Sequence, residues 1–305
     1  MKKRTLFLAL AALLTLAACE KDPQPNNNDN PGGNEEPTVV VKNVFGVADG
    51  KKVSIATGNL QYQASTDTWR IAPYAWDARK DDNCRASATF GGWIDCFGWA
   101  TSGYEGFMPY TSVNSVSAYY HDGDICGTEY DWGVHNAIVN GDKTDPAGTW
   151  RTLTYDEMEY IILMRPASTL NNVENARFAL ATVYGQVGLI LFPDVFEMPE
   201  GVALPVEHSI NNTCPYATNV YTADDWAKLE EAGCVFMPAV GCKNAADNTM
   251  IVVDYLGCYW TSTFIGNTDG LMRAAQLWFN PNLVEMGSAG VQFGRSVRLA
   301  KDITL

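Results

Sequence analysis

The stretch GCYWTSTFIG, residues 257–266, crowds aromatic and β-branched side chains into ten positions just before a Gly-Asn-Thr-Asp-Gly loop. Such side chains pack well on the pleated surface of a sheet. The stretch therefore predicts a strand over Gly257–Thr263 with Tyr259 and Trp260 in the core, and a loop side beyond it.

A second run, AAQLWFN at residues 274–280, alternates apolar and polar side chains with the period of a strand. It predicts that Leu277 and Phe279 face the core. The opposite face would then present three side chains outward: Gln276, Trp278 and Asn280.

Working outward, other short runs predict further strands, most of them in hairpins. Asp49-Gly50 separates the first two runs and predicts a type I′ turn, in which both central residues take φ > 0. The expected strands are 44–48 with 51–56, 59–63 with 69–72, then 235–238, 249–254 and 296–300.

Two segments have the start signal of a helix. Thr154 with Glu157, and Thr222 with Asp225, form capping boxes ahead of amphipathic runs, and Gly233 suits the left-handed C′ position of the second helix. Along the chain, strands are followed by a loop-rich middle, two helices and further strands. This order predicts an α+β fold with helices against antiparallel sheets. The middle, residues 74–150, predicts long ordered loops pinned by Trp76, Trp93, Trp99 and Trp132.

The N-terminus has the pattern of a bacterial lipoprotein precursor. Three basic residues precede a short apolar run, and Leu16-Ala-Ala-Cys19 resembles a lipobox, in which the cysteine is acylated. We expect a signal peptide at 1–18, a lipidated flexible tether at 19–37, rich in Pro and Asn, and a folded domain at 38–305. The expected location is the outer membrane, lipid-anchored at Cys19 and exposed at the cell surface.

The chain is acidic, with a formal charge of −14 that becomes −17 once residues 1–18 and their three cations are removed. A surface of this sign repels phosphate backbones and anionic lipid. Nucleic acid is therefore not an expected partner, and the membrane is contacted through the lipid alone.

Seven cysteines remain after Cys19, and none forms a CxxC pair or has a histidine at zinc-ligand spacing. Buried free thiols are the main expectation, with one to three disulfides as the alternative in an oxidising compartment. The three histidines, His121, His135 and His208, lie in no catalytic motif. The acidic pairs at 81–82 and 122–124 lack calcium-loop spacing and are expected to be solvated. No enzyme activity, metal or cofactor is predicted.

Several motifs together carry a family resemblance. They are GNLQYQ (58–63), WRIA (69–72), GWIDCFGWATSGY (92–104), WRTLTYDEMEY (150–160), GLILFPD (188–194), GCYWTST (257–263) and GRSVRL (294–299). Over residues 43–300 the chain resembles Bacteroidetes surface lipoproteins of the Fibrobacter succinogenes major paralogous domain type. The resemblance implies a C-type-lectin-like fold, in the branch that includes formylglycine-generating enzymes and the variable proteins of diversity-generating retroelements.

The chain lacks the sequence signatures of catalysis and of calcium-dependent sugar binding that occur in this superfamily. The spacing of Cys234, Cys242 and Cys258 differs from the copper-binding pair of formylglycine-generating enzymes, and the EPN and WND signatures of calcium-dependent lectins are missing. Neither activity is therefore expected of this chain.

The resemblance does imply where a ligand would bind. In retroelement-diversified relatives, ligand-contacting positions lie between a YWSST-like strand and a GxSVR-like strand, which here bound Phe264 to Phe293. The gene is then a candidate retroelement target, and the ligand a glycan or protein on a host, phage or neighbouring cell. Aromatic anchors mixed with adaptable polar groups favour a binding surface, formed by Phe264, Asn267, Asp269, Arg273, Gln276, Trp278, Asn280, Asn282 and Glu285.

Two other functions fit the sequence less directly. A formylglycine-generating-enzyme-like protein or a glycosidase would need a reactive thiol or two coupled carboxylates in a pocket. A structural subunit of a surface assembly would use the same loops to contact a neighbouring subunit.

Overall fold

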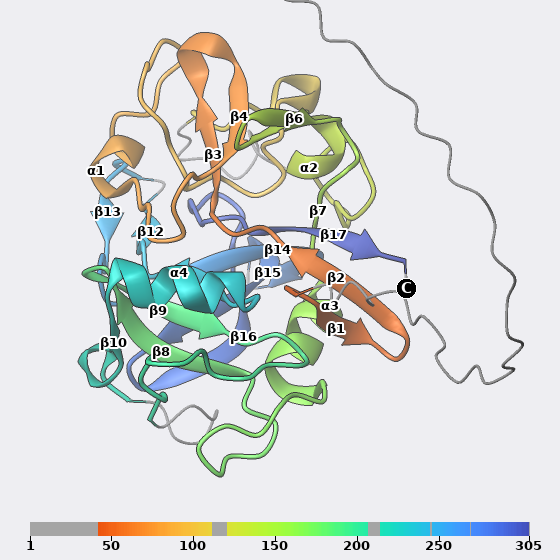
Figure 1. The fold of residues 1–305 in the computed structure, drawn as a ribbon. Helices are drawn as coiled ribbons and strands as arrows, with labels where there is room; N and C mark the ends of the chain where they lie inside the picture. Colours follow the sequence, from red (N-terminus) through yellow and green to blue (C-terminus); the bar gives the residue numbers. More distant parts are fainter. Residues whose placement is uncertain (1–41, 112–120, 207–213, 245, 269, 305) are drawn as a thin grey trace, which may run out of the picture. The chain divides into compact units, whose positions relative to one another are not determined.

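The computed structural model describes residues 42–111, 121–206, 214–244, 246–268 and 270–304 (Figure 1). The expected signal peptide, Cys19, the tether, His208 and Asp269 lie outside the described residues. The described chain is mixed α+β, as the sequence predicts, with short helices and small sheets whose strands are mostly antiparallel.

The first sheet joins the two ends of the domain. It contains the strands β1 (Phe45–Ala48), β2 (Lys51–Ile55), β17 (Leu299–Ile303) and β7 (Arg151–Thr152), in that order. The predicted β1–β2 hairpin is present, but its turn is not type I′. Of its two central residues only Gly50 has a positive φ, and a bulge between Gly46 and Ala48 takes up the difference in register.

The second sheet carries the loop-rich middle. The predicted hairpin of β3 (Leu60–Gln63) and β4 (Thr68–Ile71) forms, and β5 (Ile138–Asn140) and β6 (Lys143–Asp145) extend it through a parallel β4–β5 pair. The described part of the middle contains the short helices α1 (Lys80–Asn83) and α2 (Trp132–His135) and a 3₁₀ turn, η2 (Tyr104–Gly106). Trp99 and Trp132 are fully buried there, as expected, whereas Trp76 and Trp93 are half-buried.

Both predicted capping boxes are present. Thr154 begins α3 (Tyr155–Glu159), which continues as a π-helical turn, η4 (Tyr160–Met164). Thr222 begins α4 (Ala223–Glu231), and Gly233 follows its end with φ +98°. In both boxes the threonine hydroxyl accepts a hydrogen bond from the third helical residue, whose carboxylate accepts one from the threonine N–H.

The predicted element order was wrong between these two helices. Strands β8 (Phe178–Val183) and β9 (Gln186–Leu191) lie there and form a sheet with β11 (Val235–Pro238) and the short β10 (Val220–Tyr221). Helix α4 lies across this sheet (Figure 1), with Trp226 and Leu229 packed on Phe236 and Ile190. β8 and β9 are buried almost throughout, so their sequences show little alternation.

The quoted stretch opens a long three-stranded ribbon of β14 (Gly257–Thr268), β15 (Leu271–Asn280) and β16 (Leu283–Gly290). β16 was not predicted. The strand expected over 249–254 shortens to β13 (Met250–Ile251), which pairs with β12 (Cys242–Lys243). The strand expected from Ser296 begins at Leu299, and Ser296 makes a single parallel bridge to Tyr259 instead.

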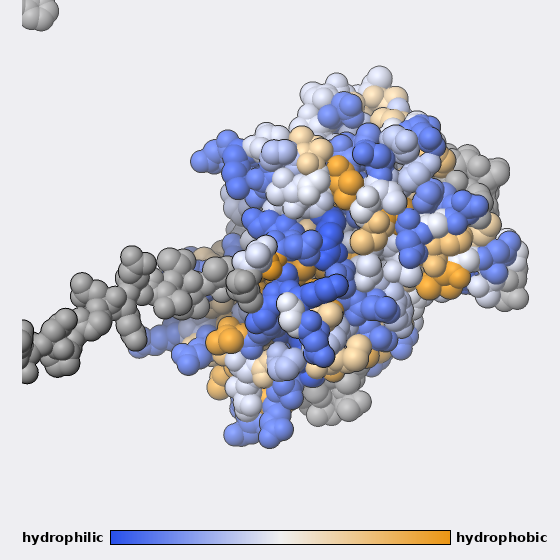
Figure 2. All heavy atoms as spheres, turned by 90° about the vertical axis from the view of Figure 1, so that its right-hand side faces the viewer, coloured by the Kyte–Doolittle hydropathy of each residue, from blue (hydrophilic) through white to orange (hydrophobic). Residues whose placement is uncertain are grey.

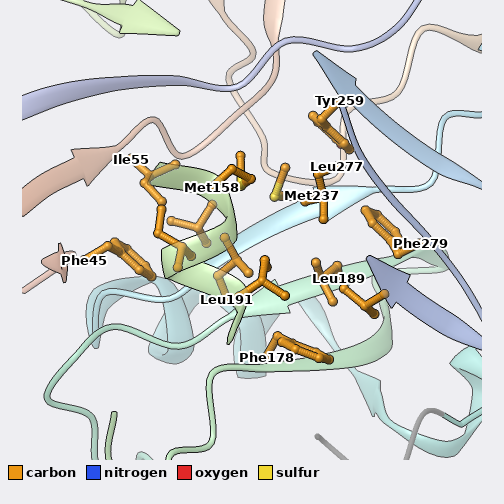
Figure 3. Close-up of a cluster of buried hydrophobic side chains, with 14 of the residues drawn as sticks. Phe45, Ile55, Met158, Phe178, Leu189, Leu191, Met237, Tyr259, Leu277 and Phe279 are labelled. Carbon is orange, nitrogen blue, oxygen red and sulfur yellow. The ribbon is translucent and has the colours of Figure 1, made fainter. Parts of the chain in front are cut away.

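One core joins the ribbon to the rest of the domain. Side chains from β1, β2, α3, β8, β9, β11, β14 and β15 converge there (Figure 3), among them Phe45, Met158, Leu189, Tyr259 and Phe279. A second core, rich in tryptophan, lies under the loop-rich middle and contains Trp69, Phe97, Trp99, Trp132 and Trp260. The ribbon contributes to both cores and so fixes the loops relative to the first core.

The surface shown in Figure 2 is mostly hydrophilic, with hydrophobic residues in small separate areas. Among the described residues, no helix combines the length and the apolar character needed to cross a bilayer.

Candidate functional site

The ribbon confirms the predicted core positions. Tyr259 and Trp260 are buried, and each polar tip has a backbone partner. The Tyr259 hydroxyl donates to Pro238 O at 2.7 Å and Trp260 Nε1 donates to Phe97 O at 2.9 Å. Leu277 and Phe279 also face the core. These side chains are scaffold and contribute no exposed surface.

The opposite face of β15 is less open than predicted. Gln276 and Asn280 are 7% and 8% exposed, so both are corrections to the expected outward-facing set. Gln276 Oε1 accepts from Arg295 Nε at 2.8 Å, and Asn280 Oδ1 accepts from the N–H of Asn282 at 2.8 Å. The segment carrying Arg295 covers this face, which alternation along one strand does not reveal.

Trp278 is half-buried and lies over a glycine. A Cβ at Gly287, on the paired strand, would be 2.9 Å from Trp278 Nε1. Glu285 pairs with Trp278 across the strands and is exposed, as is Asn282, whose side-chain amide donates to Tyr255 Oη at 3.3 Å. These residues form a small patch, called here the ribbon-base patch: Trp278, Asn282, Glu285 and Tyr255.

The other predicted site residues that the structure describes lie at the opposite end of the ribbon. Arg273, half-buried, pairs with Gly266, and the exposed Asn267 pairs with Met272. From Arg273 to Asn280 the strand advances about 23 Å, at roughly 3.3 Å per residue. The structure therefore separates the predicted binding surface into two groups, and one compact ligand would not contact both.

At this second end, Phe264 meets the loop-rich middle. Its ring stacks on Trp99, with ring centres 5.6 Å apart and planes at 27°. Its N–H donates to Asp124 Oδ1 at 2.7 Å, and Ile125 N donates to Ser262 O at 2.9 Å. Two segments about 140 residues apart in the chain are thus held side by side.

From Phe264 a series of aromatic contacts continues across the loops. His121 lies 6.3 Å from Trp99 and stacks on Tyr130 at 3.8 Å between ring centres. Tyr130 in turn has Tyr104 and Phe107 edge-on at 5.1 and 5.8 Å, and His135 lies edge-on to Tyr104 at 5.5 Å. We call this set the aromatic loop cluster: Trp99, Tyr104, Phe107, His121, Tyr130, His135 and Phe264.

Carboxylates line the aromatic loop cluster. Tyr130 Oη donates to Glu105 Oε2 at 2.5 Å, and this hydrogen bond is the main reason that the pKa of the Tyr130 hydroxyl rises to about 12. His135 Nδ1 lies 2.7 Å from Glu129 Oε2. Glu105, Glu129 and Asp122 are exposed. Apart from the fully buried Trp99, the cluster therefore combines half-buried rings with anionic hydrogen-bond acceptors, and Tyr130 stays protonated near neutral pH.

Sequence reasoning predicted Phe264 as a site residue and Trp99 as a residue that pins the loops, but it missed the tyrosines of this cluster. Tyr104, Phe107 and Tyr130 lie in segments without periodicity, so no strand or helix pattern marks their direction. A usable signal was the density of Tyr, Phe and His between residues 104 and 135, interspersed with acidic residues and glycine. His121 lies in a loop and His135 is the last residue of the short helix α2, and both belong to this cluster.

A cleft of about 470 Å³ lies elsewhere, lined by β1, β2, the first residue of η4 and the segment 166–168 that follows η4. It contains Asp194, whose Oδ1 accepts from Gly46 N at 2.9 Å and from Arg165 Nη1 at 3.1 Å, while Lys52 Nζ is 3.4 Å from Oδ2. Arg165 is fully buried. These bonds give Asp194 a structural role in holding η4 against the first hairpin.

Within the described residues, no three His, Cys, Asp or Glu side chains converge in a way that could hold a metal ion. All seven cysteines there have free thiols, five of them buried, while Cys84 and Cys126 are exposed. Comparison of the chain with protein-family models, with curated proteins and with solved structures gives no match.

Proposed function

We propose that this protein is a lipid-anchored cell-surface ligand-binding protein of the Fibrobacter succinogenes major paralogous type, with a C-type-lectin-like fold. The α+β architecture, two capped helices packed on small sheets and long ordered loops are what this resemblance implies. The ligand we favour is a glycan on a host or neighbouring cell.

The observation that carries the proposal is that the aromatic loop cluster joins Phe264 of the ribbon to aromatic residues of the loop-rich middle. The resemblance assigns ligand contacts to the interval from Phe264 to Phe293. Phe264 stacks on Trp99 at one end of a row of rings that ends near His135. Recognition is therefore shared between the tip of the ribbon and the loop-rich middle.

The chemistry of the cluster suits a sugar. An aromatic face packs against the C–H face of a pyranose ring, and Tyr combines such a face with a polar tip. Glu105, Asp122 and Glu129 supply acceptors for sugar hydroxyls around the rings. The acidic chain would disfavour sulfated or phosphorylated glycans, so a neutral glycan is the preferred class.

The test is binding of the full chain, purified in a mild detergent, to an array of neutral glycans and mucins. Tyr130→Ala and Phe264→Ala are each expected to weaken binding at least tenfold. Tyr184→Ala is the matched control, because Tyr184 is an exposed aromatic residue on the β8–β9 turn, and it should leave binding unchanged.

Three outcomes would contradict the proposal in different ways. Loss of binding with Trp278→Ala alone would place recognition at the ribbon-base patch. Equal binding by all variants would mean that neither the aromatic loop cluster nor the ribbon-base patch binds the ligand. Absence of binding to any glycan, with the variants folded, would make a protein the ligand.

The lipid anchor is tested separately. Cys19→Ser should move the protein from the membrane fraction to the soluble fraction, because the lipid is the expected means of attachment. Retention of this variant on membranes would contradict the proposed anchor without affecting the ligand assay.

A further inference from the structure

Two buried cysteines meet where β12 and β14 begin. Cys242 opens β12 and Cys258 is the second residue of β14, and they are 5% and 2% exposed. The two thiols lie close enough for each to affect the electrostatics of the other. Just before these positions, Gly241 N donates to Leu256 O at 2.8 Å, so the two backbones run close together.

The surroundings of the pair carry positive charge. The charge of the Arg295 guanidinium acts on Cys242. Arg295 is itself 7% exposed, and its Nε donates to Gln276 Oε1 at 2.8 Å. A nearby cation favours a thiolate, which is the reactive form of cysteine.

The two thiols are not equivalent. The interaction with the Cys258 thiol, followed by the charge of Arg295, lowers the pKa of the Cys242 thiol. The pair therefore favours a single thiolate beside Arg295, with the other thiol as the resolving cysteine.

We propose that Cys242 and Cys258 are a dithiol that closes to an intramolecular disulfide, covalently joining β12 to β14. The oxidant is a low-molecular-weight or protein disulfide, RSSR. The Cys242 thiolate attacks one sulfur of RSSR, forms a mixed disulfide and releases RS⁻. The Cys258 sulfur, losing its proton, then attacks Cys242 Sγ and expels the second RS⁻. The protein loses two electrons and two protons, and RSSR becomes two RSH.

Cys96 is the alternative partner, because it lies close enough to Cys258 to affect its electrostatics. Its Sγ is 3.9 Å from Ser296 Oγ, and burial raises its pKa well above the usual value. Cys96 therefore has a partner already and is a poor thiolate. The Cys242–Cys258 disulfide would close residues 242–258 into one loop beside the ribbon-base patch, since Trp278 pairs with Cys258.

The experiment equilibrates the full chain, in a mild detergent, with glutathione buffers from fully reduced to fully oxidised. Acid quenching, alkylation of the unfolded chain with a maleimide, digestion and mass spectrometry then locate the free thiols. In the oxidised buffer we expect two fewer labelled thiols and a linked pair of peptides. Fragmentation must separate Cys242 from Cys234, because trypsin leaves both in one peptide.

Two variants sharpen the result. Cys258→Ser should trap glutathione on Cys242 as a mixed disulfide, whereas Cys234→Ser, a change of an equally buried cysteine in another core, should leave the linked pair intact. Full labelling of Cys242 and Cys258 in the oxidised wild type, or a link from either to Cys96, would overturn the proposal. The wild-type map decides this even if Cys258→Ser fails to fold.

Discussion

Replacing Arg298 by methionine tests whether the GxSVR motif serves the scaffold. Arg298 is fully buried, and its two terminal nitrogens donate to three acceptors: Ala56 O at 2.9 Å, Asn59 Oδ1 at 2.7 Å and Phe236 O at 2.7 Å. Ala56 directly follows β2, Asn59 belongs to the GNLQYQ motif and Phe236 belongs to β11. One side chain thus ties together three separate parts of the domain.

The expected cost follows from those bonds. Each buried acceptor left without a donor costs about 1–3 kcal/mol. Methionine keeps the aliphatic packing and removes the cost of burying a guanidinium, whose pKa is lowered by burial. These gains offset part of the loss, so the free energy of unfolding should fall by about 3–5 kcal/mol.

Urea unfolding followed by tryptophan fluorescence measures the change as a lower midpoint at an unchanged slope. Arg85→Met is the matched control, because Arg85 is exposed, and it should alter stability by less than about 0.5 kcal/mol. A loss below about 1 kcal/mol for Arg298→Met would refute the reasoning, since the burial cost of the guanidinium would then cancel its three hydrogen bonds.

Three further predictions concern stability, each measured by urea unfolding. Burial raises the pKa of the Asp131 carboxyl to about 6, against about 4 in the unfolded chain. The contribution of this carboxyl to the free energy of unfolding is therefore fully present below about pH 4 and is lost as the pH rises through 6. Wild type should therefore lose about 3 kcal/mol relative to Asp131→Asn from about pH 4 to 7; a constant difference would contradict this. Gly188→Ala should cost about 1–3 kcal/mol, because its Cβ would lie 2.4 Å from Met237 O, and wild-type stability would count against that contact. Thr222→Ala should cost about 1 kcal/mol by removing the α4 cap, whereas Thr222→Ser should cost less; equal losses would argue against the cap.

Local determinants were predictable from the sequence. Each capping box needs a threonine and an acidic residue three positions later, and the first two hairpins need only short strands and a turn. The turn type was wrong because Asp49 does not take a positive φ, and the bulge before Ala48 supplies the register that a type I′ turn would have supplied.

Features set by distant neighbours were not predictable in this way. β8 and β9 are covered by α4 on one face and by the first core on the other, so neither strand shows the alternation of a half-exposed strand. Gln276 alternates correctly within β15, yet it is buried because Arg295, nineteen residues later, reaches across to bond it. Alternation identifies the two faces of a strand but not what covers each.

The candidate site also shows that sequence patterns identify the scaffold more readily than the residues that contact a ligand. Residues of the motifs on which the proposed resemblance rests make buried hydrogen bonds: Trp99 Nε1 donates to Thr261 O at 3.0 Å, Trp260 Nε1 to Phe97 O, and Arg298 to Asn59. A resemblance built on such residues predicts a scaffold, because these side chains cannot also reach a ligand. The proposed contacts come instead from loop side chains that the motifs position. Exchanging rings such as Tyr130 should therefore change ligand preference while leaving the unfolding midpoint nearly unchanged.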